Sequence, residues 1–218
     1  MAGQVSMKKD FQSNLPPLLK PVFGVSLDDL YDRDGTAVPS LLYQCFQAIE
    51  LFGLNVKGIY RVSGRANYVS YLKALFDNNT PSIDFTNPES FYYDINSVAG
   101  LVKQFFRDLP SPLFTSKLYS QFIEAARLSD DIERRDSLHG LINILPDTHY
   151  ATLRAIILHL NKVQERYAQN GMGARDLAIF LGPTLMSAHS GGNITDAVWQ
   201  IRIIETILNN TFQIFDDD

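Results

Sequence analysis

Helical periodicity is the feature that most restricts the fold of this chain. From about residue 39 to residue 210, apolar residues recur at steps of three and four, which is the spacing of one face of an α-helix. The segment "PSLLYQCFQAIELFG", residues 39–53, begins with proline and ends at glycine, the usual boundaries of a helix. No segment combines a period of two with hairpin turns, so a β-sheet is not expected. The sequence therefore predicts an all-α fold.

Seven further segments carry the same helical pattern. They lie at about 67–78, 94–109, 116–128, 131–145, 147–169, 174–186 and 195–210. The segment "ARDLAIFLGPTLM" (174–186) is ambiguous, since a continuous apolar run is compatible with a buried helix or a strand, but its Ala, Leu and Met content favours a helix. Proline and glycine clusters fall between the helices. We therefore expect one compact bundle of about eight or nine helices over residues 21–216, after a flexible leader over residues 1–20.

The overall composition excludes several classes of protein. Nineteen basic and twenty-four acidic residues give a net charge of −5, which argues against general binding to nucleic acids or anionic membranes. The single cysteine, Cys45, rules out an internal disulfide and lies in an apolar run, where an unreactive buried thiol is expected. No stretch reaches the roughly 18 apolar residues of a membrane span. We expect a cytoplasmic protein without a direct membrane segment, which other parts of a longer parent chain could recruit to membranes or cytoskeleton.

Motifs of a self-contained active site are missing from the sequence. The four histidines show no HExxH spacing and are expected at the surface or at the edge of the core. The glycine pair of "GLNVKG" is followed by Ile59, where a phosphate-binding loop requires lysine. No GxSxG motif is present. The sequence therefore predicts no metal, no cofactor and no catalytic centre that this chain completes alone.

The segment "GIYRVSG", residues 58–64, places a charged arginine among apolar neighbours. Ile59 and Val62 could anchor the backbone while Arg61 stays free, and Gly58 and Gly64 allow conformations that other residues adopt only at a cost. Alternatively, Arg61 caps the carbonyls of the preceding helix or pairs with an internal carboxylate. Spacing alone leaves both interpretations open.

Two later segments also combine charge with apolar runs. In "VKQFFRDLPSPLF", Lys103 and Arg107 stand four residues apart and share one helix face, either as an ordinary solvated face or opposite acceptor groups. In "RDLAIFLGPTLM", Asp176 and Thr184 bracket an apolar run. An ordinary buried helix with a polar start explains that segment equally well.

In this order, "GIYRVSG", "LVKQFFRDLPSPLF" and "LAIFLGPTLM" resemble the Rho-family GTPase-activating (RhoGAP) domain, and the resemblance extends from about residue 22 to residue 215. It implies a RhoGAP-like helical bundle that acts in trans on a Rho-family small GTPase in its GTP-bound form, with GTP and Mg²⁺ belonging to the partner. A monomer that binds no nucleic acid is expected. The rival hypothesis is a non-catalytic GTPase-binding module with the same fold.

The resemblance also implies roles for particular residues. Arg61 stands at the catalytic arginine finger of the G-x-Y-R-x-S-G loop. Support of that loop and binding of the GTPase would fall to Gly58, Tyr60, Ser63, Gly64, Lys103, Arg107, Asp176, Thr184 and Asn210. Within this set, Arg107 is expected to hydrogen-bond the backbone of the finger loop, and Lys103 to orient the loop and the GTPase.

One position departs from the family pattern. Asp176 stands where the family usually carries asparagine, and a carboxylate cannot donate the hydrogen bonds of an amide. It could pair instead with Arg175 or with a cation of the finger loop. Thr184 is expected to make a polar contact to the GTPase, and Asn210, which matches a recurring family asparagine, is a further interface candidate.

Overall fold

Eleven α-helices and two short 3-10 helices form the part of the chain that this computed structural model describes, residues 20–78, 83–186 and 194–215. The α-helices are α1 (Leu27–Asp34), α2 (Ser40–Phe52), α3 (Ala66–Asp77), α4 (Ile95–Asp108), α5 (Tyr119–Arg127), α6 (Asp131–Ile142), α7 (Asp147–Gln164), α8 (Tyr167–Asn170), α9 (Ala174–Met186), α10 (Ala197–Asn209) and α11 (Thr211–Ile214). The 3-10 helices are η1 (Pro88–Phe91) and η2 (Ile194–Asp196). The described residues contain no β-strand, so the predicted all-α class is confirmed. Of the leader expected over residues 1–20, only Lys20 is described.

All eight predicted segments form helices, and the ambiguous segment is helix α9. The sequence analysis missed α1, although its ends carry clear capping residues. The Ser26 side chain accepts a hydrogen bond from the Asp29 N–H, and Gly35 ends the helix in the left-handed conformation at φ 70°, as N-caps and C-caps commonly do. Only Leu27 and Leu30 of α1 are buried. Two apolar positions are too few to show a helical period.

The segment expected as one helix over residues 147–169 is divided into α7 and α8. The cause is Asn170, whose side-chain amide donates to the carbonyl of Val163 at 2.8 Å and to that of Leu54 at 2.8 Å. The Arg166 N–H also turns back to the Val163 carbonyl, at 3.1 Å, which tightens the last turn of α7. Asn170 thereby ties the end of α7 to the chain that follows α2.

Helices α9 and α10 pack closely and run antiparallel. Arg175 near the start of α9 pairs with Glu205 late in α10, at 3.2 Å. Further along α9, a Cβ on Gly182 would lie 3.1 Å from the carbonyl oxygen of Gln200. The missing side chain therefore lets the two backbones approach. Pro183 follows within the same helix.

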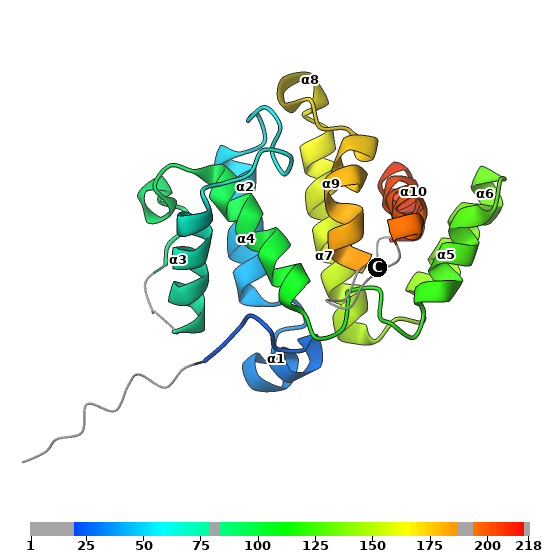
Figure 1. Ribbon diagram of the computed structural model, residues 1–218, viewed down its shortest axis with the longest axis horizontal. Helices are drawn as coiled ribbons and strands as arrows, with labels where there is room; N and C mark the ends of the chain where they lie inside the picture. Colours follow the sequence, from blue (N-terminus) through cyan, green and yellow to red (C-terminus); the bar gives the residue numbers. More distant parts are fainter. Residues whose placement is uncertain (1–19, 79–82, 187–193, 216–218) are drawn as a thin grey trace, which may run out of the picture.

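Figure 1 shows α2, α4, α7 and α9 side by side at the centre of the molecule, and helix contacts link α2 with α4 and α7, and α4 with α9. Helix α3 lies outside α4, and α5 and α6 lie beyond α10. The loop between α2 and α3, residues 53–65, lies at the same end of the molecule as α8 (Figure 1). This loop, called the α2–α3 loop from here on, carries Arg61.

Three observations concern membrane spans, metal sites and the single cysteine. Among the described helices, none is long and apolar enough to cross a membrane. The described residues also contain no group of three or more His, Cys, Asp or Glu side chains placed to hold a metal ion. Cys45 is fully buried in α2, and burial raises the pKa of its thiol. It is thus a core residue, as predicted.

Candidate functional site

The α2–α3 loop is a compact series of turns held to the rest of the molecule at its middle. The carbonyl of Gly58 accepts hydrogen bonds from the N–H groups of Arg61 and Val62, both at 2.8 Å. The Gly58 N–H donates to the carbonyl of Asn170, also at 2.8 Å. Gly58 has φ +75°, a conformation that favours glycine. The turn that carries Arg61 is therefore fastened to the last residue of α8.

Arg61 is exposed at this turn. Within the described ranges, its guanidinium has no hydrogen-bond or ion-pair partner. Its Nη2 and Nε lie 3.1 and 3.2 Å from where a Cβ on Gly58 would be, so the side chain lies across the glycine. The end of α2 is closed by the N–H of Gly53 donating to Ile49. Among the residues that the structure describes, Arg61 neither caps α2 nor forms an internal ion pair.

Tyr60 holds the turn from inside. It is fully buried and has φ +67°, which costs a residue other than glycine about 1–2 kcal/mol. Lys103 Nζ on α4 donates to the carbonyl oxygen of Tyr60 at 2.8 Å. Such strain persists only where the surroundings fix the residue, and it is common at functional sites.

Of the two apolar residues expected to anchor the loop, Ile59 and Val62, only Ile59 does so. Ile59 is fully buried and anchors the loop as predicted, whereas 44% of Val62 is exposed. The second anchor is therefore Tyr60, not Val62. Ser63 is exposed as well, so the loop presents Arg61, Val62 and Ser63 to solvent above a buried Ile59–Tyr60 pair.

The end of the loop rests directly on the first turn of α4. A Cβ on Gly64 would lie 2.3 Å from both Cα and N of Ser97, a separation that no side chain could occupy. The next N–H, of Arg65, donates to Ser97 Oγ at 3.0 Å and to Asp94 Oδ2 at 3.3 Å. Asp94 also caps α4 by accepting from the Ser97 N–H. Gly64 is thus required by a close backbone approach, and not by an unusual φ.

The two cations of α4 differ in their contact with the α2–α3 loop. Lys103 contacts the loop backbone, at the Tyr60 carbonyl. Arg107 is exposed, and its Nη2 donates to Gln104 Oε1 of the same helix at 3.0 Å. The expectation that Arg107 hydrogen-bonds the loop backbone is therefore wrong in the free domain. The loop crosses α4 near its N-terminal end, so it reaches Lys103 one helical turn before Arg107. Burial, and next the charge of Arg107, lower the pKa of Lys103.

Asp176 stabilises the start of α9. Its Oδ2 accepts the N–H of Gly173 at 3.1 Å, so the side chain of the third helical residue bonds back to the residue before the helix, as in a capping box. Arg175 pairs with Glu205, so the suggested Asp176–Arg175 pair is not formed. An oxygen acceptor suffices for this cap, and the amide of asparagine is not required for it.

The remaining candidates are less closely connected to Arg61. Thr184 is half-buried, eight residues beyond Asp176 in α9. Asn210 caps the end of α10 by donating from Nδ2 to the carbonyl of Thr206 at 2.8 Å. The structure therefore brings the α2–α3 loop, Lys103 and the end of α8 together directly. Thr184 and Asn210 lie on the flanking α9–α10 pair.

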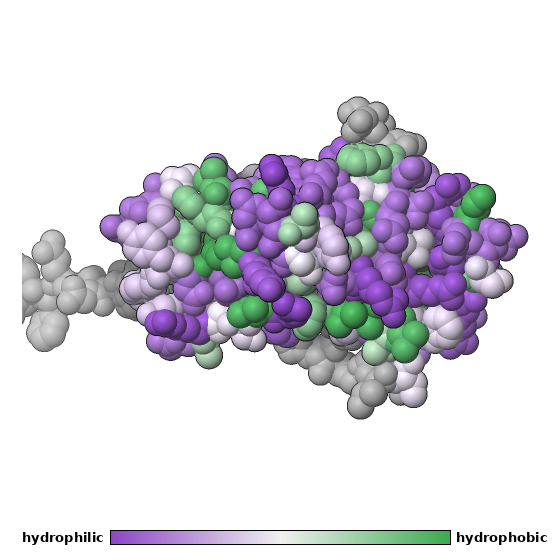
Figure 2. Space-filling view, turned by 90° about the horizontal axis from the view of Figure 1, so that it is seen from above, coloured by the Kyte–Doolittle hydropathy of each residue, from purple (hydrophilic) through white to green (hydrophobic). Residues whose placement is uncertain are grey.

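The end of the molecule that carries this site is mainly hydrophilic. Figure 2 looks onto this end from above and shows hydrophilic side chains over much of the face, interrupted by apolar patches. Arg61 and Arg65 at the α2–α3 loop are exposed, while Lys103 is half-buried. Arg107 is exposed too, near the other end of α4. The two exposed arginines of the loop belong to a chain whose net charge is −5.

Sequence reasoning missed one residue connected to the site, His159. It was expected at the surface or the edge of the core, but it is only 2% exposed, and its Nε2 lies 2.8 Å from the Tyr60 hydroxyl. A signal was present in the sequence. His159 stands three residues after Ile156 and four before Val163, so it is a polar residue on the apolar stripe of a helix. The prediction for His189 lies outside the described residues.

The sequence and the structure both assign this chain to a known class of domain. The chain matches the RhoGAP domain family over residues 39–190, and it belongs to that family. Its curated relatives include the probable Rho-GTPase-activating protein 7 of Schizosaccharomyces pombe, 37% identical over 202 residues, and beta-chimaerin of Mus musculus, 36% identical over 200 residues. These alignments cover 93% and 90% of this chain but only 28% and 60% of the two relatives.

Solved structures agree with this assignment. The crystal structure of human Rho GTPase activating protein 15 matches with a TM-score of 0.84 at 32% identity, covering 98% of this chain and 100% of that one. The BH domain from GRAF, the GTPase regulator associated with focal adhesion kinase, matches with a TM-score of 0.75 at 28% identity, covering 88% and 98%. The predicted RhoGAP-like bundle is confirmed.

Proposed function

We propose that this domain stimulates GTP hydrolysis by a Rho-family small GTPase, with Arg61 as an arginine finger that enters the partner's nucleotide site. The main observation in support of this proposal is the state of Arg61 in the free domain. Arg61 is exposed and has no partner among the described residues, although the adjoining Tyr60 is fully buried. A free guanidinium on a firmly held loop is suited to a partner's chemistry and not to the stability of its own chain.

The chemistry follows from the charge of the reaction. During phosphoryl transfer, negative charge on the phosphate oxygens needs stabilisation, and a guanidinium supplied in trans provides it while water is excluded. Arginine fingers accelerate hydrolysis by about 10³–10⁵-fold, or roughly 4–7 kcal/mol of barrier. The planar guanidinium can donate to two oxygens at once, whereas lysine offers a point charge. GTP and Mg²⁺ would belong to the partner, so we propose no cofactor for this chain.

The surroundings of Arg61 support binding of an acidic, nucleotide-loaded partner. Arg65 on the loop and Arg107 on α4 add exposed cations, and Lys103 fixes the loop backbone. We propose that Arg107, which the loop leaves exposed, contacts the GTPase directly. Thr184 and Asn210 are proposed as outer contacts on the α9–α10 pair.

The test is phosphate release from a panel of GTP-loaded Rho-family GTPases. Wild type is compared with Arg61→Ala, Arg61→Lys and the control Arg127→Ala, which removes an exposed arginine of α5. Wild type and the control should accelerate hydrolysis, whereas both Arg61 variants should lose at least about 10³-fold of the acceleration. Binding of the GTP-loaded GTPase should be largely kept.

Two outcomes would contradict the proposal. Equal rates for wild type and Arg61→Ala would remove the finger assignment. Binding without acceleration by wild type would favour the non-catalytic GTPase-binding module. Because Arg61 is exposed, Arg61→Ala should change the free energy of unfolding by no more than about 0.5 kcal/mol. Loss of folding would indicate that Arg61 is structural.

A further inference from the structure

The side chain of Tyr60 extends from the site into the core and ends at α7. Its hydroxyl lies 2.8 Å from Nε2 of His159, and the two rings meet edge to face with centroids 5.9 Å apart. The imidazole also stacks on Phe46, with ring centroids 4.4 Å apart. Tyr60 and His159 are both buried. Water therefore does not compete for their hydrogen bond, which fixes the ring of the residue next to Arg61.

Glu50 on α2 determines the orientation of the imidazole. Its Oε1 lies 3.0 Å from His159 Nδ1, and its Oε2 accepts from Lys162 Nζ at 2.8 Å. The hydrogen bond from His159 lowers the pKa of Glu50, so the carboxylate is an acceptor and Nδ1 carries the proton. Burial lowers the pKa of His159, so Nε2 of the neutral ring accepts a hydrogen bond and the Tyr60 hydroxyl donates it.

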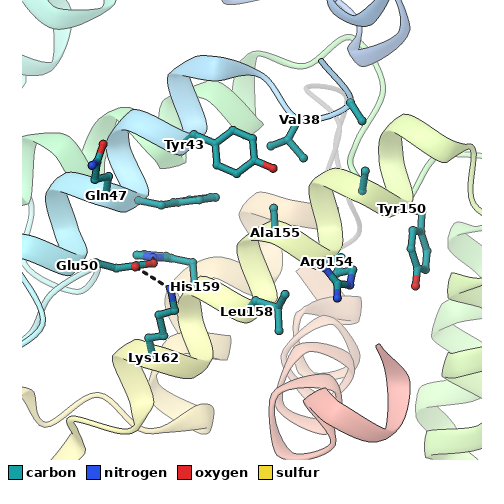
Figure 3. A pocket seen from close by; sticks show the side chains of 13 residues that line it. Val38, Tyr43, Gln47, Glu50, Tyr150, Arg154, Ala155, Leu158, His159 and Lys162 are labelled. Atoms are coloured by element: carbon teal, nitrogen blue, oxygen red, sulfur yellow. Dashed lines mark hydrogen bonds and ion pairs between the residues drawn. The ribbon is translucent and has the colours of Figure 1, made fainter. Parts of the chain in front are cut away.

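This row of hydrogen bonds begins at the surface. Glu50, His159 and Lys162 are among the residues that line a cavity of about 520 Å³ between α2 and α7. Figure 3 shows Glu50 and His159 side by side on the two facing helices, with Lys162 bonded to the carboxylate. The bonds therefore link two packed helices at the cavity to the α2–α3 loop.

We propose that His159, oriented by Glu50, is a positioning residue that acts through Tyr60 to fix the direction in which Arg61 leaves the loop. Tyr60 has φ +67° and would relax toward negative φ if its side chain were released. That rotation would move the adjoining Arg61 N–H away from the Gly58 carbonyl, where it now donates at 2.8 Å. The effect on hydrolysis rests on the proposed function of Arg61. The effect on the loop is a property of the free domain.

The test uses two measurements on each variant. The first is hydrogen exchange of the Arg61 and Val62 amides in the free domain, followed by NMR. The second is single-turnover hydrolysis by the GTP-loaded Rho-family GTPase most accelerated by wild type, over a range of domain concentrations. This separates the maximal rate from the half-saturating concentration.

The variants isolate the hydrogen bond from the ring. Tyr60→Phe removes only the hydroxyl, and His159→Asn retains an amide near the Nδ1 position that cannot reach Tyr60. His159→Gln extends an amide to the Nε2 position and is the rescue variant. The control is His149→Ala, which removes another buried histidine of α7. The ring nitrogen Nδ1 of His149 binds the carbonyl of Leu113 at 2.8 Å.

We expect Tyr60→Phe and His159→Asn to accelerate exchange of both amides by about 3–10-fold, as loss of one buried hydrogen bond predicts. The maximal rate should fall about 10-fold or more because the finger is misplaced. The half-saturating concentration should change by less than about 2-fold, since the contact surface is retained. His159→Gln should restore both readouts, and His149→Ala should leave both near wild type.

Three results would overturn the proposal. These are unchanged amide exchange in Tyr60→Phe and His159→Asn, faster exchange without loss of maximal rate, or the same losses in His149→Ala. If wild type accelerates none of the GTPases, the proposed function fails by itself. Amide exchange in the free domain then still decides whether His159 fixes the loop.

Discussion

Replacing Gly64 by alanine should separate the α2–α3 loop from α4. The added Cβ would lie 2.3 Å from Cα and N of Ser97, whereas ordinary contact begins at 3.4 Å. The difference between these distances is 1.1 Å. Both atoms belong to the backbone of a helix, so no side-chain rotation can relieve the overlap. The loop must withdraw by about this distance or α4 must deform.

Three effects determine how much stability this substitution removes. Forced overpacking costs about 1–3 kcal/mol. Withdrawal of the loop also breaks the hydrogen bond from the Arg65 N–H to Ser97 Oγ, which contributes about 0.5–1.5 kcal/mol. Alanine also lowers the conformational entropy of the unfolded chain, and this effect stabilises the folded state by about 0.4–1 kcal/mol. We therefore expect Gly64→Ala to lower the free energy of unfolding by about 0.5–4 kcal/mol, measured by urea denaturation.

Gly140 provides the matched control. It lies inside α6, and a Cβ there would meet no atom within 4 Å. Gly140→Ala should raise the free energy of unfolding by about 0.5–1 kcal/mol, since alanine favours the helix. The close approach would be refuted if Gly64→Ala were as stable as wild type, or if both alanine variants changed stability alike. Gly64→Ala should also lower the maximal rate of GTP hydrolysis in the proposed reaction, and Gly140→Ala should not.

Three further predictions concern single side chains. Asp176→Ala should lower the free energy of unfolding by about 0.5–2 kcal/mol because the N–H of Gly173 loses its acceptor. Asp176→Asn keeps an oxygen acceptor, so its loss in free energy of unfolding should be less than half as large. Thermal denaturation of both variants measures the difference. Burial lowers the pKa of His159 below that of the unfolded chain, so the unfolded state binds the proton first and stability falls as the pH drops below about 6.5. Glu50, whose pKa is also lowered, acts in the same direction at lower pH. Denaturation at pH 7 and pH 5 should show a smaller loss in His159→Gln than in wild type, and equal losses would contradict the assignment. Lys103→Met keeps the apolar stem but removes the contact to the loop carbonyl, so it should lower the maximal rate of the proposed reaction about 10-fold. An unchanged rate would show that this contact is not needed.

The sequence predicted a helix wherever apolar residues recur at helical spacing over several turns. In α4 and its C-cap, the five positions of the expected apolar stripe, Val98, Leu101, Val102, Phe105 and Leu109, are all buried. Helix α1 was missed because its eight residues bury only two leucines, too few for a period to appear. The boundary between α7 and α8 was missed for a different reason. It depends on a hydrogen bond from Asn170 to Leu54, and residues so distant in sequence leave no local pattern.

The residues of the site were predicted in part, but their contacts were not. Motif order pointed to Arg61 and to the two cations of α4, and the structure shows Arg61 exposed and Lys103 in contact with the loop. Which of the two cations contacts the loop depends on where the loop crosses α4, and so Arg107 was assigned the wrong hydrogen bond. The position of Asp176 was noted, but its role as a cap became visible only with the Gly173 hydrogen bond.

The sequence by itself therefore determined the all-α class and the order of the predicted helices, because periodicity and capping are properties of neighbouring residues. Arg61 was singled out by the order of three motifs that resemble a known family, since spacing alone had left its role open. The tertiary structure alone decided that Gly64 touches the backbone of Ser97, that Lys103 holds Tyr60, and that His159 reaches the Tyr60 hydroxyl. Each of these contacts joins residues far apart in the chain. Their geometry is fixed by how α2, α4 and α7 pack, and no local pattern of residues specifies that packing.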